Sequence, residues 1–150
     1  MVNTYSCLNV HCVFSTKDRE PCLTGELEER LRSYLGGTVR KHKMKALAVG
    51  GTSDHVHLLI TLPATMAVAV AMRLVKGSST WWVRENFATH RKFKWQAGYG
   101  AFSVSPSQME QTIAYIMNQK EHHRGRTFQE EYLAFLEKYG IEFDERYLWT

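Results

Sequence analysis

Four short stretches of the chain have the apolar, β-branched and aromatic composition of β-strands. They are residues 5–16, 44–49, 55–62 and 99–104. The first stretch alternates between apolar and polar side chains, which is the pattern of a half-buried strand. Pro63 ends the third stretch, because proline cannot continue the hydrogen-bond ladder of a strand.

Apolar positions at helical spacing lie between and after these strands and predict four helices. Thr24 can cap the first helix, whose apolar positions include Leu27, Leu31 and Leu35. The Gly36-Gly37 pair either ends this helix or weakens it before a continuation toward residue 43. The other helices are expected from a Thr65 cap to about Asn86, from Ser105 or Ser107 to about His123, and from about Thr127 to Tyr139.

The resulting order is strand, helix, strand, strand, helix, strand, helix, helix. It predicts an α+β fold in which an antiparallel sheet has helices packed on it. A chain of 150 residues is long enough for one compact domain with a core and too short for two comfortable ones. The chain shows no repeat and no Gly- or Ser-rich linker, so we expect a single domain over residues 1–150.

The first candidate for chemistry is the sequence His55-Val56-His57 in the third predicted strand. Strand side chains alternate between faces, so both histidines project from one face while Val56 points into the core. Two neighbouring imidazoles are a natural pair of metal ligands. The pattern fits two histidines on a solvated sheet face equally well, and both interpretations stay open at this point.

Tyr115 and Gln119 form a second candidate pair, on the helix that begins near Pro106. Their spacing places them one turn apart on the same helix face. A tyrosine phenoxide forms a stable phosphoester and can attack a phosphodiester, and the carbonyl oxygen of Gln119 suits a hard divalent cation. On spacing alone, a core position for Tyr115 is the simpler interpretation.

Three further histidines are weaker candidates. His11 lies in the first strand and could approach the histidine pair, although an ordinary sheet position is the simpler interpretation. His122 and His123 could add ligands or touch DNA, although a plain pair at a helix end is simpler.

Charge is unevenly distributed along the chain, whose formal net charge is +4. Between residues 73 and 94 Glu85 is the single acid among many bases, whereas the tail from Glu130 onward is acidic. This asymmetry fits a polyanion-binding face with the acidic tail elsewhere, but scattered solvated lysines would give the same count. The candidate phosphate contacts are Arg73, Lys76, Arg84, Arg91, Lys92 and Lys94. The aromatic residues nearby, which could stack on unpaired bases or fill the core, are Trp81, Trp82, Trp95 and Tyr99.

Several classes of protein find no support. The longest apolar run, residues 66–72, is far shorter than the roughly 20 residues that a membrane-spanning helix needs. Phosphate-loop, dinucleotide-binding, serine-hydrolase and HExxH motifs do not occur in the sequence, so we expect no nucleotide cofactor. The cysteines lack CxxC spacing, and we expect small buried residues in a reducing, cytoplasmic compartment; they are Cys7, Cys12 and Cys22.

Four segments of the chain, in this order, resemble the single-tyrosine transposases of the HUH superfamily, the TnpA type of small bacterial insertion sequences. They are HCVFSTKDREP at 11–21, DHVHLLI at 54–60, KWQAGYGAFSVS at 94–105 and YIMNQKEHH at 115–123. Each segment is weakly diagnostic alone, but together, distributed over residues 11–123, they are specific.

The resemblance implies a role for each candidate residue. His55 and His57 would be the metal-binding histidines, Tyr115 the nucleophile and Gln119 the third ligand of a Mg²⁺ or Mn²⁺ ion. The implied fold is a ferredoxin-like or RRM-like sandwich. The implied activity is cutting and rejoining of single-stranded DNA through a 5′-phosphotyrosine, with recognition of hairpins at the element ends. The resemblance also implies a homodimer with shared sites, in which one subunit gives the histidines and the other the tyrosine helix.

Three alternatives stay open. A host-domesticated relative would cut repetitive palindromes by the same chemistry without moving an element. A non-catalytic nucleic-acid-binding module would bind without needing metal. A two-histidine phosphoesterase would require a second histidine motif, which the sequence lacks.

Overall fold

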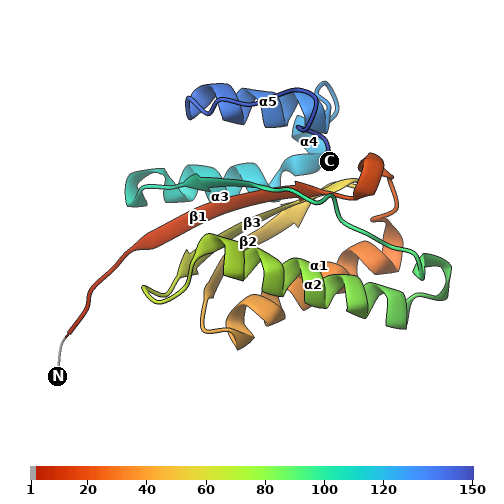
Figure 1. The fold of residues 1–150 in the computed structure, drawn as a ribbon, viewed down its shortest axis with the longest axis horizontal. Helices are drawn as coiled ribbons and strands as arrows, with labels where there is room; N and C mark the ends of the chain where they lie inside the picture. The colour runs from red at the N-terminus through yellow and green to blue at the C-terminus, as the bar shows by residue number, and fades with distance from the viewer. Residues whose placement is uncertain (1–2) are drawn as a thin grey trace.

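The four predicted strands form one antiparallel sheet in the computed structural model of the chain, which describes residues 3–150 (Figure 1). The strands are β1 (Leu8–Ser15), β2 (Lys45–Gly51), β3 (His55–Leu62) and β4 (Gly100–Ser103). Their order across the sheet is β2-β3-β1-β4. With one helix after β1 and another after β3, this is the β-α-β-β-α-β arrangement of ferredoxin-like domains. The predicted α+β fold is confirmed.

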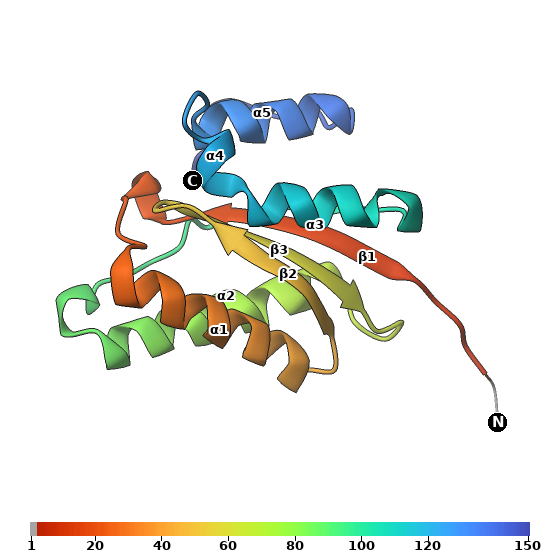
Figure 2. The same ribbon diagram turned by 180° about the vertical axis from the view of Figure 1, so that it is seen from behind.

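Helices cover both faces of the sheet (Figures 1 and 2). On one face lie α1 (Gly25–Lys41) and α2 (Val68–Asn86). On the other lie α3 (Met109–Met117), α4 (Gln119–His122) and α5 (Phe128–Lys138). Short 3₁₀ helices occur at η1 (Lys17–Arg19), η2 (Ala88–His90) and η3 (Pro106–Gln108). Over residues 3–150, no helix is both long enough and apolar enough to cross a membrane.

The first two helices differ from their predicted boundaries. α1 continues through both of its central glycines and ends at Lys41. The prediction that Thr65 caps the second helix is wrong, because the chain first turns after Pro63, whose carbonyl accepts a hydrogen bond from the Met66 N–H. α2 therefore begins only at Val68.

The long helix expected over residues 105–123 is divided. It opens with η3, and the backbone leaves the helical conformation at Asn118, with φ −106° and ψ 26°. This break separates α3 from the single turn of α4 and redirects the chain that follows. Cys7 also differs from expectation: it is exposed, because it precedes β1 and lies outside the sheet.

Side chains alternate along β1 and β3, and this alternation positions the histidines. Even-numbered residues such as Phe14, Leu58 and Ile60 are buried in the main core, which includes residues of α1 and α2. Odd-numbered residues face α3 and α5, and on this face His57 lies opposite Val13 in the strand register. The histidines therefore lie beneath the C-terminal helices.

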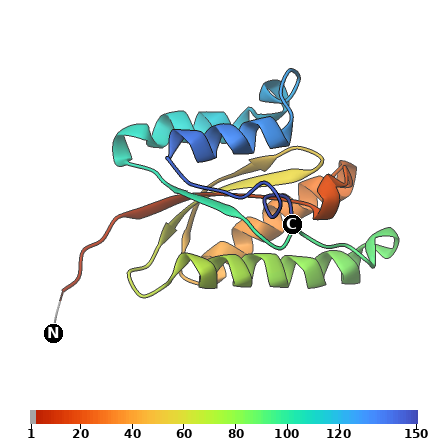
Figure 3. The same ribbon diagram turned by 45° about the horizontal axis from the view of Figure 1, so that its top comes forward.

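α3 and α5 lie side by side across that face of the sheet (Figure 3). Ile116 of α3 is fully buried in a cluster with Leu59 of β3, and Phe128 of α5 packs in a second cluster with Val13. Gly50 of β2 allows α3 to approach closely, because a Cβ atom at this position would overlap the carbonyl oxygen of Ile116. These contacts fix the position of α3, which carries the candidate Tyr115, and of α5 beside it.

Candidate metal and tyrosine site

The two histidines of β3 are fully buried, with 0% exposure each, so the interpretation of a solvated pair is wrong. Nδ1 of His55 lies 2.7 Å from a carboxylate oxygen of Asp54. Nδ1 of His57 lies 2.7 Å from Nε2 of His11, a neighbour on β1. Both Nδ1 atoms are therefore engaged at the sheet, and both Nε2 atoms are directed toward the helices above.

Gln119 lies directly over the first of these rings. Its side-chain oxygen is 3.1 Å from Nε2 of His55 and 3.1 Å from Nε2 of His123. Its amide nitrogen donates to the backbone carbonyl of Tyr115 at 3.3 Å, and this bond turns the oxygen toward the imidazoles. The structure thus brings together Gln119 and the histidine pair that the sequence singled out.

Glu131 of α5 occupies the centre of the cluster and is only 1% exposed. One of its oxygens lies 2.9 Å from Nε2 of His57 and 3.5 Å from Nε2 of His55, and the other lies 3.2 Å from Nε2 of His123. Burial alone would raise the pKa of this carboxyl, but hydrogen bonds from His123 and His57 outweigh burial and hold the pKa far below its ordinary value. Glu131 is therefore a carboxylate.

Tyr115 reaches the same point from α3, and its hydroxyl donates a hydrogen bond to Glu131. Burial, and next this hydrogen bond, raise the pKa of the phenol above its ordinary value. The ring lies 4.6 Å from that of His122 and 5.8 Å from that of His57, measured between centroids. Tyr115 also lines a cavity of about 300 Å³, whose other lining residues include Gln108, Gln111, Thr112, Arg126 and Lys138.

These side chains form a donor set that can hold a metal ion. The ligand atoms of His55, His57, His123 and Glu131 all lie within 4.8 Å of one another. Ligands at right angles around a cation, with bonds of about 2.1 Å, stand about 3.0 Å apart. The separations of 2.9–3.5 Å between the Nε2 atoms and the oxygens of Glu131 fit that spacing.

The hydrogen-bond pattern of the imidazoles gives a second test of fit. In His123, Nδ1 lies 2.6 Å from the Arg126 carbonyl and Nε2 faces the oxygens of Gln119 and Glu131. His55 likewise has oxygen atoms at both ring nitrogens. A neutral imidazole can donate from one nitrogen only. A cation among the Nε2 atoms satisfies these contacts without a second proton on each ring.

For three residues of this site the simpler interpretation of the sequence is wrong. The acidic tail was expected away from the functional face, yet Glu131 lies in the site. The simpler interpretations of His123 and His11 were a plain helix end and an ordinary sheet position, and the structure supports the alternatives left open, a place among the ligands for His123 and an approach of His11 to the histidine pair. The break after α3 directs His123 toward the cluster, and α5 directs Glu131 to it. One signal was present: Glu131 lies between Phe128 and Tyr132 on the apolar side of α5.

The predicted phosphate contacts lie elsewhere. Arg73, Lys76 and Arg84 belong to α2, on the opposite face of the sheet from Tyr115. Burial lowers the pKa of Lys76 to about 8, and its ammonium group donates to the carbonyls of Gln96, Ala97 and Gly98 at 2.7, 3.2 and 2.8 Å. Arg91, Lys92 and Lys94 are exposed on the segment after η2. DNA contact by these six residues stays a prediction.

The four aromatic residues near this basic stretch are placed differently from one another. Trp95 is buried in the main core, and Trp82 stacks on Tyr34 with ring centroids 4.6 Å apart. Tyr99 is partly buried against the same core. Trp81 is 62% exposed and can meet a partner in solution.

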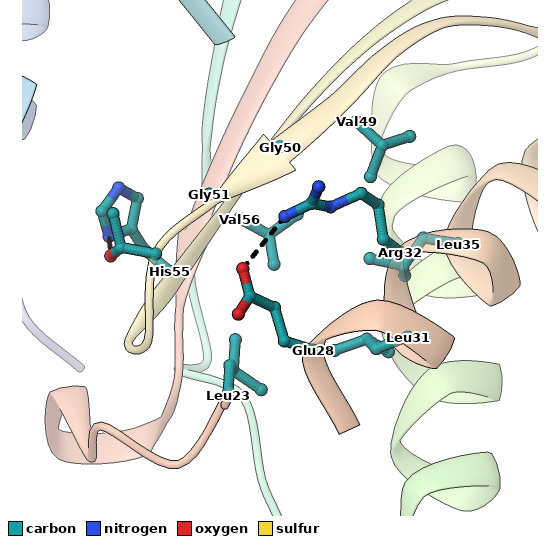
Figure 4. Close-up of a pocket in the computed structure, with 11 residues that line it drawn as sticks. Leu23, Glu28, Leu31, Arg32, Leu35, Val49, Gly50, Gly51, His55 and Val56 are labelled. Atoms are coloured by element: carbon teal, nitrogen blue, oxygen red, sulfur yellow. Dashed lines mark hydrogen bonds and ion pairs between the residues drawn. The ribbon is translucent and has the colours of Figure 1, made fainter. Parts of the chain in front are cut away.

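A smaller cavity lies on the α1 side of the turn between β2 and β3. Glu28 and Arg32 of α1 form an ion pair there, with 3.0 Å between a guanidinium nitrogen and a carboxylate oxygen. In Figure 4 the ring of His55 points away from this pair. Its volume of about 20 Å³ has room for little more than one water molecule. Lys120 of α4 also pairs with Glu28 at 3.3 Å, so this cluster ties α4 to α1 rather than forming a second site.

A ferredoxin-like sheet that carries a buried His-x-His pair beneath a tyrosine helix defines the class of single-tyrosine HUH transposases. A family model described as "Transposase IS200 like" matches residues 4–119. The chain belongs to this family. The matched region contains His55, His57, Tyr115 and Gln119, and it ends before His123 and Glu131.

Individual relatives agree with this assignment. The transposase for insertion sequence element IS200 of Salmonella typhimurium is 30% identical over 117 residues, covering 74% of this chain and 76% of the relative. The ISDra2 transposase TnpA of Deinococcus radiodurans is 25% identical over 122 residues, covering 76% of this chain and 85% of the relative.

Two solved structures share the fold. A crystal structure assigned to a transposase of Deinococcus radiodurans has a TM-score of 0.67 and 22% identity, covering 79% of this chain and 95% of its own. The REP-associated tyrosine transposase bound to a REP hairpin has a TM-score of 0.57 and 16% identity, covering 77% of this chain and 68% of its own. At these identities the likeness concerns the fold.

Proposed function

We propose that this IS200-like transposase cuts and rejoins single-stranded DNA at insertion-sequence ends through a covalent 5′-phosphotyrosine. The observation that supports this most is the position of the Tyr115 hydroxyl, which is hydrogen-bonded to a carboxylate inside a cluster of metal-binding side chains. A phenol placed beside a cation site can attack a phosphodiester whose charge is neutralised there.

In the proposed reaction the Tyr115 oxygen forms a bond to phosphorus, and the bond from phosphorus to the 3′ oxygen of the neighbouring nucleotide breaks. The products are a 5′-phosphotyrosine and a free 3′-hydroxyl. A 3′-hydroxyl from another DNA end then attacks the phosphotyrosine and releases Tyr115. The bond energy is kept in the phosphoester, so the cycle needs no nucleotide cofactor.

The residues of the site have separate roles in the proposed reaction. His55, His57 and Gln119 would hold the proposed Mg²⁺ or Mn²⁺, which, when bound, supplies Lewis-acid neutralisation of the scissile phosphate. Glu131 holds the Tyr115 hydroxyl in one orientation. The cavity beside Tyr115 is lined by Arg126 and Lys138, whose positive charges suit an incoming phosphate.

The substrate and assembly are part of the proposal. The structural relative bound to a REP hairpin supports a hairpin-bearing single strand as the DNA partner. We further propose a cytoplasmic homodimer with shared sites. An exchange of helices between two copies conserves each contact described above, so the same site can form between subunits.

The direct test is Tyr115→Phe, incubated with labelled single-stranded hairpin DNA and Mg²⁺ or Mn²⁺. We expect DNA binding to be retained and the covalent adduct to be lost, because the attacking oxygen is absent. Tyr147→Phe removes an exposed hydroxyl outside the site and is the matched control, with normal adduct yield. Adduct formation by the Tyr115→Phe variant at the wild-type level would remove Tyr115 from the reaction.

Metal removal provides an independent arm of the same test. EDTA is expected to abolish adduct formation by the wild-type protein, and added Mn²⁺ or Mg²⁺ is expected to restore it. Hairpin binding with no adduct under any metal condition would favour the non-catalytic binding module instead. Imperfect palindromes on both sides of the gene would separate transposition from the domesticated alternative.

A further inference from the structure

The C-terminal segment beyond Gln119 contributes two side chains to the candidate site. The IS200-like family match ends at residue 119, yet His123 and Glu131 both lie inside the cluster with the two strand histidines. Glu131 comes from α5, and only 1% of its surface is exposed. Burial of a carboxylate costs free energy because the group loses its hydration. This cost is offset only where positive or hydrogen-donating partners surround the carboxylate.

The groups that surround Glu131 are also arranged so that they can accept a cation. The Nδ1 atoms of His55, His57 and His123 contact Asp54, His11 and the Arg126 carbonyl. Each of these partners can accept the Nδ1 proton of its imidazole, and in that tautomer the Nε2 lone pair faces inward. The inward-facing atoms are then three imidazole nitrogens, the Gln119 oxygen and the Glu131 carboxylate.

We propose that α5 is part of the metal site, with Glu131 as a carboxylate ligand and His123 as an additional imidazole ligand. This proposal rests on the metal-dependent function proposed above. One carboxylate oxygen lies between the Nε2 atoms of His57 and His55, at 2.9 and 3.5 Å. The other accepts the hydrogen bond from Tyr115. Glu131 therefore links the cation to the nucleophile and is also a positioning residue for Tyr115.

The proposed ligands predict which cations bind. Imidazole nitrogens together with a carboxylate suit first-row transition ions, whereas Mg²⁺ prefers oxygen ligands and keeps several waters. Three imidazoles around one carboxylate thus favour Mn²⁺ over Mg²⁺ more strongly than two histidines and a glutamine would. The carboxylate also offsets half of the charge of a divalent ion.

Calorimetric titration of the purified, metal-free full chain with MnCl₂ and with MgCl₂ tests the proposal without measuring activity. We expect Glu131→Gln, which keeps the shape and removes the charge, to weaken Mn²⁺ binding by at least about tenfold. The preference for Mn²⁺ over Mg²⁺, which comes from the imidazoles, should fall instead in His123→Ala, which removes one of them. Glu137→Gln, on the exposed side of α5, is the matched control and should bind as the wild type does.

Glu131→Asp distinguishes loss of the carboxylate ligand from loss of folding. It retains a carboxylate and should therefore bind Mn²⁺ more tightly than Glu131→Gln. Circular dichroism of the metal-free variants checks that each is folded. Wild-type Mn²⁺ affinity in Glu131→Gln, or no binding by the wild-type protein, would overturn the proposal. If metal binding depends on Glu131 but Tyr115 forms no adduct, the proposed function fails while this ligand assignment stands.

Discussion

The Nδ1 atom of His57 contacts Nε2 of His11, and this contact bears on how His57 can bind a cation. Burial, and next the charge of His57, lower the pKa of His11 to about 3, so this ring is neutral at physiological pH. If His57 carries its proton on Nδ1, that proton is donated to Nε2 of His11, 2.7 Å away. Nε2 of His57 is then free to bind a cation.

His11→Leu removes this acceptor and fills the same buried position with an apolar side chain. We expect Mn²⁺ affinity to fall by about 10- to 100-fold, the usual effect of losing a partner that orients a ligand. Calorimetric titration measures the change, and His42→Leu, at the end of α1, is the control. An unchanged affinity in His11→Leu would show that His57 is oriented without His11.

At the scale of secondary-structure elements, the position of Tyr115 depends on how closely α3 approaches β2. Gly50 leaves no space for a side chain, and the atom in the way is a backbone carbonyl oxygen of Ile116 that cannot rotate aside. Gly50→Ala must therefore displace α3, and with it Tyr115 and Gln119.

We expect Gly50→Ala to lower the free energy of unfolding by about 1–3 kcal/mol, as overpacking of a closely packed contact does. Adduct yield should fall more than stability alone explains, because the nucleophile moves relative to His57. Gly37→Ala, inside α1 with open space around it, is the control and should raise stability by about 0.5–1 kcal/mol. Denaturant titration and adduct yield measure both effects, and a Gly50→Ala protein as stable and active as the wild type would contradict this explanation.

Some features of the strands and helices at the site could be predicted from the sequence, and others could not. The period of two in β3 was enough to place both histidines on one face, although not to show that this face is buried. The spacing of four residues placed Gln119 one turn from Tyr115. The division of the helix at Asn118 was not predicted, because apolar residues continue at helical spacing up to it. Glu131 was missed because its partners lie on β3, on α3 and at His123 just after α4, and local charge counting carries no information about such distant contacts.

At the scale of the whole molecule, the candidate site is assembled from two parts of the chain. The sheet provides His11, His55 and His57, whereas Tyr115 and Glu131 come from helices that follow β4. The basic residues of α2 lie on the far side of the same sheet. A DNA strand that contacts both α2 and Tyr115 must pass around the edge of one subunit or extend to a second one, and the proposed homodimer with shared sites permits the latter.

Mixing two inactive variants tests whether the parts are shared between subunits. His57→Ala removes a proposed metal ligand from the sheet, and Tyr115→Phe removes the proposed nucleophile from α3. With shared sites, a mixed dimer has one site with both defects and one intact site. Random pairing of equal amounts should then restore about a quarter of the wild-type adduct yield. With unshared sites every subunit carries one defect, and the mixture should stay as inactive as either variant alone. That result would assign each site to a single chain, as the contacts within this protomer already allow.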